Sequence, residues 1–115
     1  MGGCEGTRED LIRDLEVRAR WRTQRAAHDP DERNTRSAEA LARAARDVAA
    51  VPDDDPRLAR LAGFYAAAPD DAIAAYLNAQ NRIMSRHGYD TADATTDGLL
   101  AALVDAADEA SSGSI

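Results

Sequence analysis

The sequence predicts an all-α fold, a small bundle of four to five short helices. Alanine, the strongest helix former, supplies 26 of the 115 residues. Aromatic residues, which favour strands, make up only 4% of the chain. Between turn signals, the large apolar residues recur at spacings of three and four, the period of an amphipathic helix. Together these observations indicate helices rather than strands.

Turn signals divide the chain into two helical parts. Residues 7–51 are expected to form a helical hairpin, and residues 52–110 a helical core region of three helices. The Gly-rich residues 1–6 and the Ser-rich residues 111–115 are expected to be flexible ends.

The first helix is expected to begin at Thr7, a residue type that caps helix N-termini, and to run to about Ala27. Acids lie early in this segment and arginines late, as the helix dipole favours. Its main apolar stripe consists of Leu11, Ile12, Leu15 and Ala19.

The second helix is expected to use Asp29 as its N-cap and Pro30 as its first residue, and to end near Val51. Leu41 and Val48 are its main large apolar side chains, and alanines supply the rest of its stripe. A helix with so few large side chains must pack closely against its neighbours.

Asp55 followed by Pro56 repeats this start signal and predicts a third helix over about 56–67. Pro69, which two aspartates follow, either opens a fourth helix or kinks a continuous one. The sequence leaves these two alternatives open.

Gly88, which follows two basic residues, is expected to end the fourth helix. The last helix is expected to start between Asp90 and Asp97 and to end near Ala110. The three helices of the core region carry these apolar stripes: Leu58, Leu61, Ala62 and Tyr65; Ile73, Tyr76, Leu77, Ile83 and Met84; and Leu99, Leu100, Leu103, Val104 and Ala107.

The net charge of −7 lies in the second half of the chain. Residues 1–50 hold ten arginines and ten acids, whereas residues 51–115 hold four arginines and eleven acids. An acidic surface disfavours nucleic acids and anionic membranes as partners. No apolar run is long enough for a membrane span or a signal peptide, so we expect a cytoplasmic protein.

The residue types also exclude several chemistries. The chain has no lysine, which excludes phosphate-loop, Schiff-base and kinase lysines. A single cysteine, Cys4, excludes an internal disulfide and a C-x-x-C site. We find no catalytic or cofactor-binding pattern and expect no cofactor. The exclusive use of arginine and the abundance of Ala, Asp and Gly suggest a GC-rich genome, such as a bacterial or phage one.

The nearest feature to a chemical signature is a short segment that contains His87, Asp90, Asp93 and Asp97. A calcium loop of the EF-hand type counted from Asp93 needs a carboxylate at position 12, where Val104 stands. Short polar side chains are also the types that cap helix N-termini. We therefore expect a helix stop, a polar turn and a capped helix start. A divergent metal-binding or hydrolytic site of His87 and the three aspartates is the alternative.

Val17 and Trp21 form a second apolar face on the first helix, nearly opposite its main stripe, and Arg18 and Arg25 flank them. Tryptophan and arginine are the residue types that dominate protein-interface hot spots. These four residues are the predicted protein-interaction site. Two alternatives are packing of Val17 and Trp21 within the chain or a dimer, and nucleic-acid binding through the Arg18–Arg25 segment.

We therefore expect a non-enzymatic protein that binds another protein, as an inhibitor, an antitoxin-like partner, or an assembly or adaptor factor. Leu, Ile, Val and Phe together supply only 18 residues, so the core is thin. A homodimer is a further expectation, because pairing two Ala-rich hairpins would bury area that one chain cannot.

Overall fold

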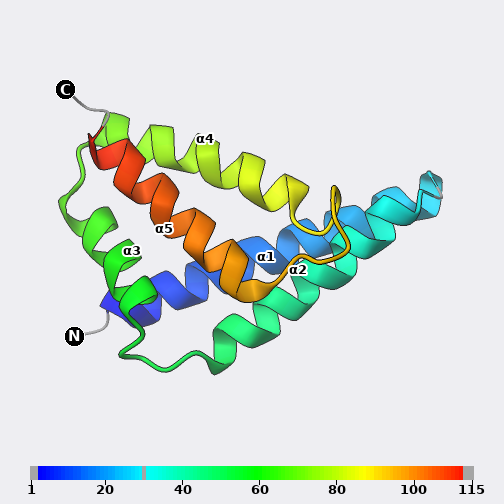
Figure 1. Cartoon of the computed structure of the whole chain (residues 1–115), viewed down its shortest axis with the longest axis horizontal. Coiled ribbons are helices and arrows are strands. Elements are labelled where there is room, and N and C mark those ends of the chain that lie inside the picture. Colours follow the sequence, from blue (N-terminus) through cyan, green and yellow to red (C-terminus); the bar gives the residue numbers. More distant parts are fainter. Residues whose placement is uncertain (1–2, 30, 113–115) are drawn as a thin grey trace.

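Five α-helices and no strand make up the part of the chain that the computed structural model describes, residues 3–29 and 31–112 (Figure 1). The helices are α1 (Gly3–His28), α2 (Glu32–Ala50), α3 (Pro56–Ala67), α4 (Asp70–Arg86) and α5 (Thr96–Ser112). The predicted all-α class is confirmed.

The helices form two antiparallel pairs joined by the short α3. The contact between α1 and α2 is the most extensive in the molecule, and α4 packs along α5. α3 contacts α1 and α5. In Figure 1 the tip of the α1–α2 hairpin projects beyond the end of α4, and the molecule measures 42 × 31 × 21 Å.

A single apolar core joins residues from all five helices, so the hairpin and the three-helix region are packed together. The small size of many core residues brings the helices close, as the alanine-rich sequence of α2 predicts. The largest fully buried side chains of this core are Leu15, Leu41, Val48, Leu61, Tyr76, Met84, Leu100 and Leu103.

The start of α1 differs from the prediction, because the helix begins at Gly3 rather than after a cap at Thr7. Thr7 is buried within the helix and lines a small cavity with Leu61 and Tyr65 of α3. Its place in a helix–helix contact, rather than its capping propensity, determines its conformation.

The start of α2 also differs from the prediction. The N-cap is Asp31 rather than Asp29, and its carboxylate accepts a hydrogen bond from the backbone N–H of Arg33 at 2.9 Å. The backbone N–H of Asp29 instead donates to the carbonyl of Arg25 at the end of α1. Pro30, predicted as the first residue of this helix, lies outside the described residues.

α3 begins as predicted. Asp55 caps the helix by accepting a hydrogen bond from the backbone N–H of Arg57 at 2.8 Å, and Pro56 is its first residue. Pro69 breaks the chain into two helices rather than kinking one, because α3 ends at Ala67 and α4 begins at Asp70. Ala68, the residue before the proline, is extended, as the steric bulk of a proline ring favours.

The turn between α4 and α5 follows the predicted pattern of stop and cap. Gly88 has a φ of +72°, the left-handed conformation that ends many helices. α5 begins at Thr96, after Thr95 accepts a hydrogen bond from the backbone N–H of Gly98 at 3.1 Å. The helix continues to Ser112, slightly beyond the predicted end.

The prediction that all members of the apolar stripes face the core is wrong for two residues. Leu77 of α4 is 46% exposed, and Tyr65 of α3 is also exposed. Phe64, which the stripe analysis left out, is buried against Tyr76 with the ring centroids 5.2 Å apart. Phe64 follows Leu58 and Leu61 at a spacing of three, and the buried side of α3 continues through Phe64 rather than Tyr65.

The Gly88 position should not tolerate a side chain. A Cβ atom there would lie 2.5 Å from the Cβ of Ala40 and 3.1 Å from the carbonyl oxygen of Arg36, in a backbone conformation that L-residues avoid. We expect Gly88→Ala to lower the free energy of unfolding by about 2–4 kcal/mol, measured by urea denaturation. Gly63→Ala is the matched control, because a Cβ there meets nothing within 4 Å and the helix interior favours alanine by about 0.5–1 kcal/mol. Equal effects of the two substitutions would contradict the close approach of α4 to α2.

Candidate functional site

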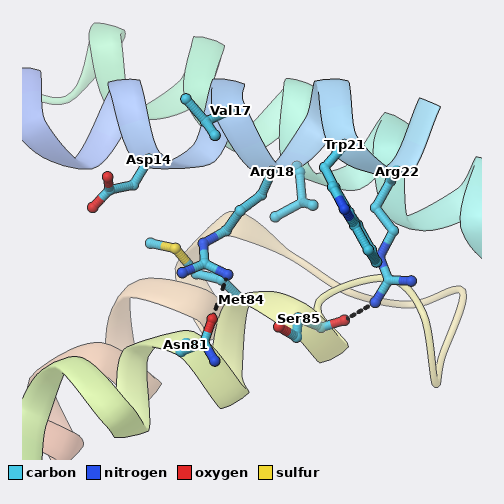
Figure 2. Close-up of a pocket in the computed structure, with 9 residues that line it drawn as sticks. Asp14, Val17, Arg18, Trp21, Arg22, Asn81, Met84 and Ser85 are labelled. Carbon is cyan, nitrogen blue, oxygen red and sulfur yellow. Dashed lines mark hydrogen bonds between the residues drawn. The ribbon is translucent and has the colours of Figure 1, made fainter. Parts of the chain in front are cut away.

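A groove of about 410 Å³ runs between α1 and α4. Figure 2 shows the two helices facing each other across it, with side chains from both reaching into the space between them. The groove is lined by Asp14, Val17, Arg18, Trp21 and Arg22 of α1, Leu41 of α2, and Asn81, Met84 and Ser85 of α4.

Three of the four residues of the predicted interaction site, Val17, Arg18 and Trp21, line this groove, and Arg25 lies against the Trp21 ring. Val17 and Trp21, one helical turn apart, are 48% and 52% exposed, so neither is packed into the core. Arg18 reaches across the groove, and the guanidinium carbon of Arg25 lies 5.8 Å from the centre of the Trp21 ring. The structure therefore leaves the second apolar face of α1 open to solvent.

Polar bridges cross the groove between its two walls. Arg18 donates a hydrogen bond to the side-chain oxygen of Asn81 at 2.8 Å (Figure 2). Nearer the α3 end, the side-chain amide of the buried Gln80 donates to a carboxylate oxygen of Asp14 at 3.0 Å. These contacts hold α1 beside α4 and leave the outer part of the groove free.

Arg22 connects more elements than any other side chain at the groove. It donates to the side-chain oxygen of Asn34 in α2 at 2.8 Å and to the carbonyl of Ser85 in α4 at 2.6 Å. Its guanidinium carbon lies 4.4 Å from the ring centre of Tyr89 and 4.9 Å from that of Trp21. One cation thus joins α1, α2, α4 and the turn before α5, and it restrains the indole ring.

The arginines of the groove carry charge that the described part of the chain does not neutralise by ion pairs. Arg57 and Arg60 each pair with a carboxylate, whereas Arg18, Arg22 and Arg25 have no carboxylate within 4.0 Å among the described residues. Burial lowers the pKa of Arg22, while Tyr89 and Asp90 act in the opposite direction. The guanidinium nevertheless stays charged at neutral pH, because its pKa starts far above this range.

All the exposed large apolar side chains in the described ranges lie along this side of the molecule. They are Val17, Trp21, Tyr65 and Leu77, which we call the α1–α4 face. Leu77 lies one turn before Asn81 on the same side of α4. Tyr65 lies at the α3 end, where its hydroxyl donates to Gln80 at 3.4 Å.

The residues of the alternative metal or hydrolytic site have different surroundings, and Asp93 is exposed in the turn before α5. His87 is 8% exposed at the end of α4, where its carbonyl accepts a hydrogen bond from the Ser37 hydroxyl at 2.8 Å. Asp97 pairs with Arg57, and Asp90 lies beside Arg86. Within residues 6–29 and 31–112, no three His, Cys, Asp or Glu side chains are grouped to bind a metal ion.

The arginine-rich segment of the nucleic-acid alternative does not present one continuous basic surface. Arg18 and Arg22 bind groups of α2 and α4, whereas Arg20 lies on the opposite side of the hairpin near Glu16 and Glu39.

None of the helices in the described part of the chain is both long enough and apolar enough to span a membrane.

Several residues of the groove carry no signal in the sequence. Asn34, Asn81, Ser85 and Tyr89 become partners of the α1 arginines only because the fold brings distant segments together. Helical periodicity identifies Val17 and Trp21 as a separate face, but it does not indicate which helix lies beside them.

Removing the Arg22 guanidinium should destabilise the fold. We expect Arg22→Ala to lower the free energy of unfolding by about 1–2 kcal/mol, because it removes two hydrogen bonds from a charged donor and leaves buried Asn34 without this partner. Arg20→Ala, an exposed change on the same helix, should alter it by less than about 0.5 kcal/mol. Urea denaturation measures both, and a small effect at Arg22 would show that its bridges do not support the bundle.

His87 should make stability depend on pH. Burial, with a smaller contribution from Arg43, lowers the pKa of the His87 imidazole below its ordinary value of 6.5. The unfolded chain therefore binds the proton more readily, and stability present above pH 6.5 is lost as the pH falls toward the folded-state pKa. Below pH 6.5 we expect the free energy of unfolding to fall by up to about 1.4 kcal/mol per pH unit.

Urea denaturation at pH 7, 6 and 5 tests this dependence. His87→Gln should flatten it, whereas the control His28→Gln, at the exposed end of α1, should leave it unchanged. An unaltered slope in His87→Gln would assign the pH dependence to other groups.

Comparison of the chain with protein-family models, with curated proteins and with solved structures finds no significant match. The function must therefore be inferred from the groove and from the residues that line it.

Proposed function

We propose that this protein is a non-enzymatic binding module that docks another protein chain on the α1–α4 face. The observation that carries the proposal is the position of the exposed apolar side chains. Val17 and Trp21 line the groove, and Leu77 lies one turn before Asn81 on the same side of α4. Tyr65 adjoins them at the α3 end through its hydrogen bond to Gln80. An exposed apolar patch rimmed by polar groups is typical of a protein-interaction site.

The chemistry of the groove supports the same proposal. Tryptophan and arginine are enriched among residues that dominate binding energy. Trp21 has 52% of its surface available for a partner, and Arg22 and Arg25 lie against its ring. A partner that covers this ring would bury a large apolar surface without needing to order a flexible side chain first.

Site-specific photo-cross-linking tests the proposal. Purified protein with benzoylphenylalanine in place of Val17 is irradiated alone and in an extract of its native host. We expect discrete cross-linked adducts, because Val17 is exposed at the centre of the α1–α4 face. Trp21→Ala in the same protein should reduce their yield about tenfold or more, as expected for the loss of an interface hot spot.

The matched control carries the same cross-linker at Ala101, an exposed position on α5 away from the groove. Equal yields of the same adducts at positions 17 and 101 would indicate non-specific collisions and contradict the proposal. Circular dichroism of each variant confirms that the comparison is made between folded proteins.

A further inference from the structure

We propose that the chain bound at the α1–α4 face is a second copy of this protein, with the two α1 helices packed antiparallel about a two-fold axis. This inference rests on the proposed function, since it names the partner of the same face. It follows from the order of side chains along α1.

The groove side of α1 carries a stripe at the spacing of a helix–helix interface. Asp14, Arg18, Trp21 and Arg25 follow one another at intervals of four, three and four residues, which places them on one side of the helix. Three of these four residues line the groove, and Arg25 lies against the Trp21 ring. We call this set the α1 stripe.

The α1 stripe is complementary to the same stripe of a second copy that runs in the opposite direction. If the axis crosses α1 midway between Arg18 and Trp21, Arg25 of each chain lies level with Asp14 of the other. Trp21 then lies level with Arg18 of the second copy, with Val17 of that copy beside it. The contact therefore pairs a cation with a carboxylate and a cation with an aromatic ring, and symmetry makes each pair twice.

The groups in these pairs still have capacity for a second partner. Gln80 occupies only one carboxylate oxygen of Asp14, and Asn81 occupies one nitrogen of Arg18. The Arg25 guanidinium has no hydrogen bond or ion pair among the described residues, and Trp21 is half exposed. Dimer formation thus needs no existing bridge across the groove to break.

Charge favours a second copy over a uniformly acidic or basic partner. An acidic partner that matched Arg18 and Arg25 would meet Asp14, and a basic partner that matched Asp14 would meet the arginines. The α1 stripe also belongs to the electrically neutral first half of a chain whose net charge is −7. Two such chains therefore approach with less repulsion along α1 than along their acidic helices.

A standard interface must extend beyond the α1 stripe. The chain exposes 6815 Å², compared with about 6,100 Å² for a compact monomer of its 12.3 kDa mass. A standard interface covers about 800 Å² per chain, more than the middle of one helix provides. Leu77 and Asn81 lie on the same side of α4 as the groove and can extend the contact.

Sedimentation and fluorescence test the dimer directly. At about 100 µM the protein should sediment at twice the chain mass and dissociate on dilution. Trp21 is the single tryptophan, so its emission should shift to shorter wavelength over the same concentration range as the dimer forms.

Charge reversal identifies the pairing. Arg25→Glu and Asp14→Arg should each raise the dissociation constant about tenfold or more, because each change places like charges together at two symmetric positions. The double variant Asp14→Arg/Arg25→Glu should restore much of the affinity, since it rebuilds both pairs with reversed polarity. Arg20→Glu on the far side of α1 is the control and should leave the dimer unchanged. Circular dichroism checks the fold of each variant, and Arg25→Glu alone still tests the pairing if Asp14→Arg does not fold.

Each outcome decides between the proposals. A dimer that both single changes weaken and the double change restores supports the inference. A wild-type chain that remains monomeric at about 100 µM overturns it. If position 17 then cross-links specifically to a different protein, the proposed function stands without the dimer. If it forms no specific adduct, both proposals fail. A dimer insensitive to Arg25→Glu also overturns the α1 pairing.

Discussion

The close approach of the α4–α5 turn to α2 at Gly88 is the tightest constraint on how this thin core packs. With only 18 Leu, Ile, Val and Phe residues in 115, the chain cannot fill wide spaces between helices. Gly88 allows close packing just after α4, because its backbone lies against Ala40 and the Cα of Ser37 with no room for a side chain. The Ser37 hydroxyl then donates to the carbonyl of His87, which satisfies a polar group in the same contact.

The boundary between α1 and α4 is closed in a different way. Side chains with terminal polar groups cross this boundary between the two helices. Arg18 binds Asn81, Arg22 binds the Ser85 carbonyl, and Gln80 binds Asp14. Such bridges keep two helices at a fixed separation while leaving the surface above them uncovered. The groove is therefore a consequence of how this thin core is completed at its edge.

Local signals account for the parts of the fold that the sequence predicts well. Asp55 with Pro56, Pro69 and Gly88 act through their own backbone chemistry, so the ends that they define are close to those observed. Errors arise where tertiary contacts override local preference. Thr7 packs against α3 instead of capping α1, and Leu77 faces solvent although it lies on an apolar stripe.

The distinction between local signals and tertiary contacts also applies to the candidate site. Periodicity is sufficient to separate Val17 and Trp21 from the core-facing side of α1, because it depends only on spacing within one helix. Asn34 and Ser85, which bind Arg22, are separated from it by 12 and 63 positions in the chain. Pairing over such separations depends on the relative orientation of α1, α2 and α4, which no single-helix pattern contains.

The bridges of Arg22 also bear on the binding proposed for the α1–α4 face. A free tryptophan side chain loses rotational freedom when a partner covers it, and this loss opposes binding. Here the Arg22 cation lies 4.9 Å from the indole centre while Asn34 and the Ser85 carbonyl hold the guanidinium in place. The contact with Arg22 therefore restrains the orientation of Trp21 in the unbound chain. A more apolar boundary between α1 and α4 would bury this ring and stabilise the isolated chain, but it would remove the exposed surface. The polar bridges thus keep the most interface-prone side chain of the molecule both ordered and accessible.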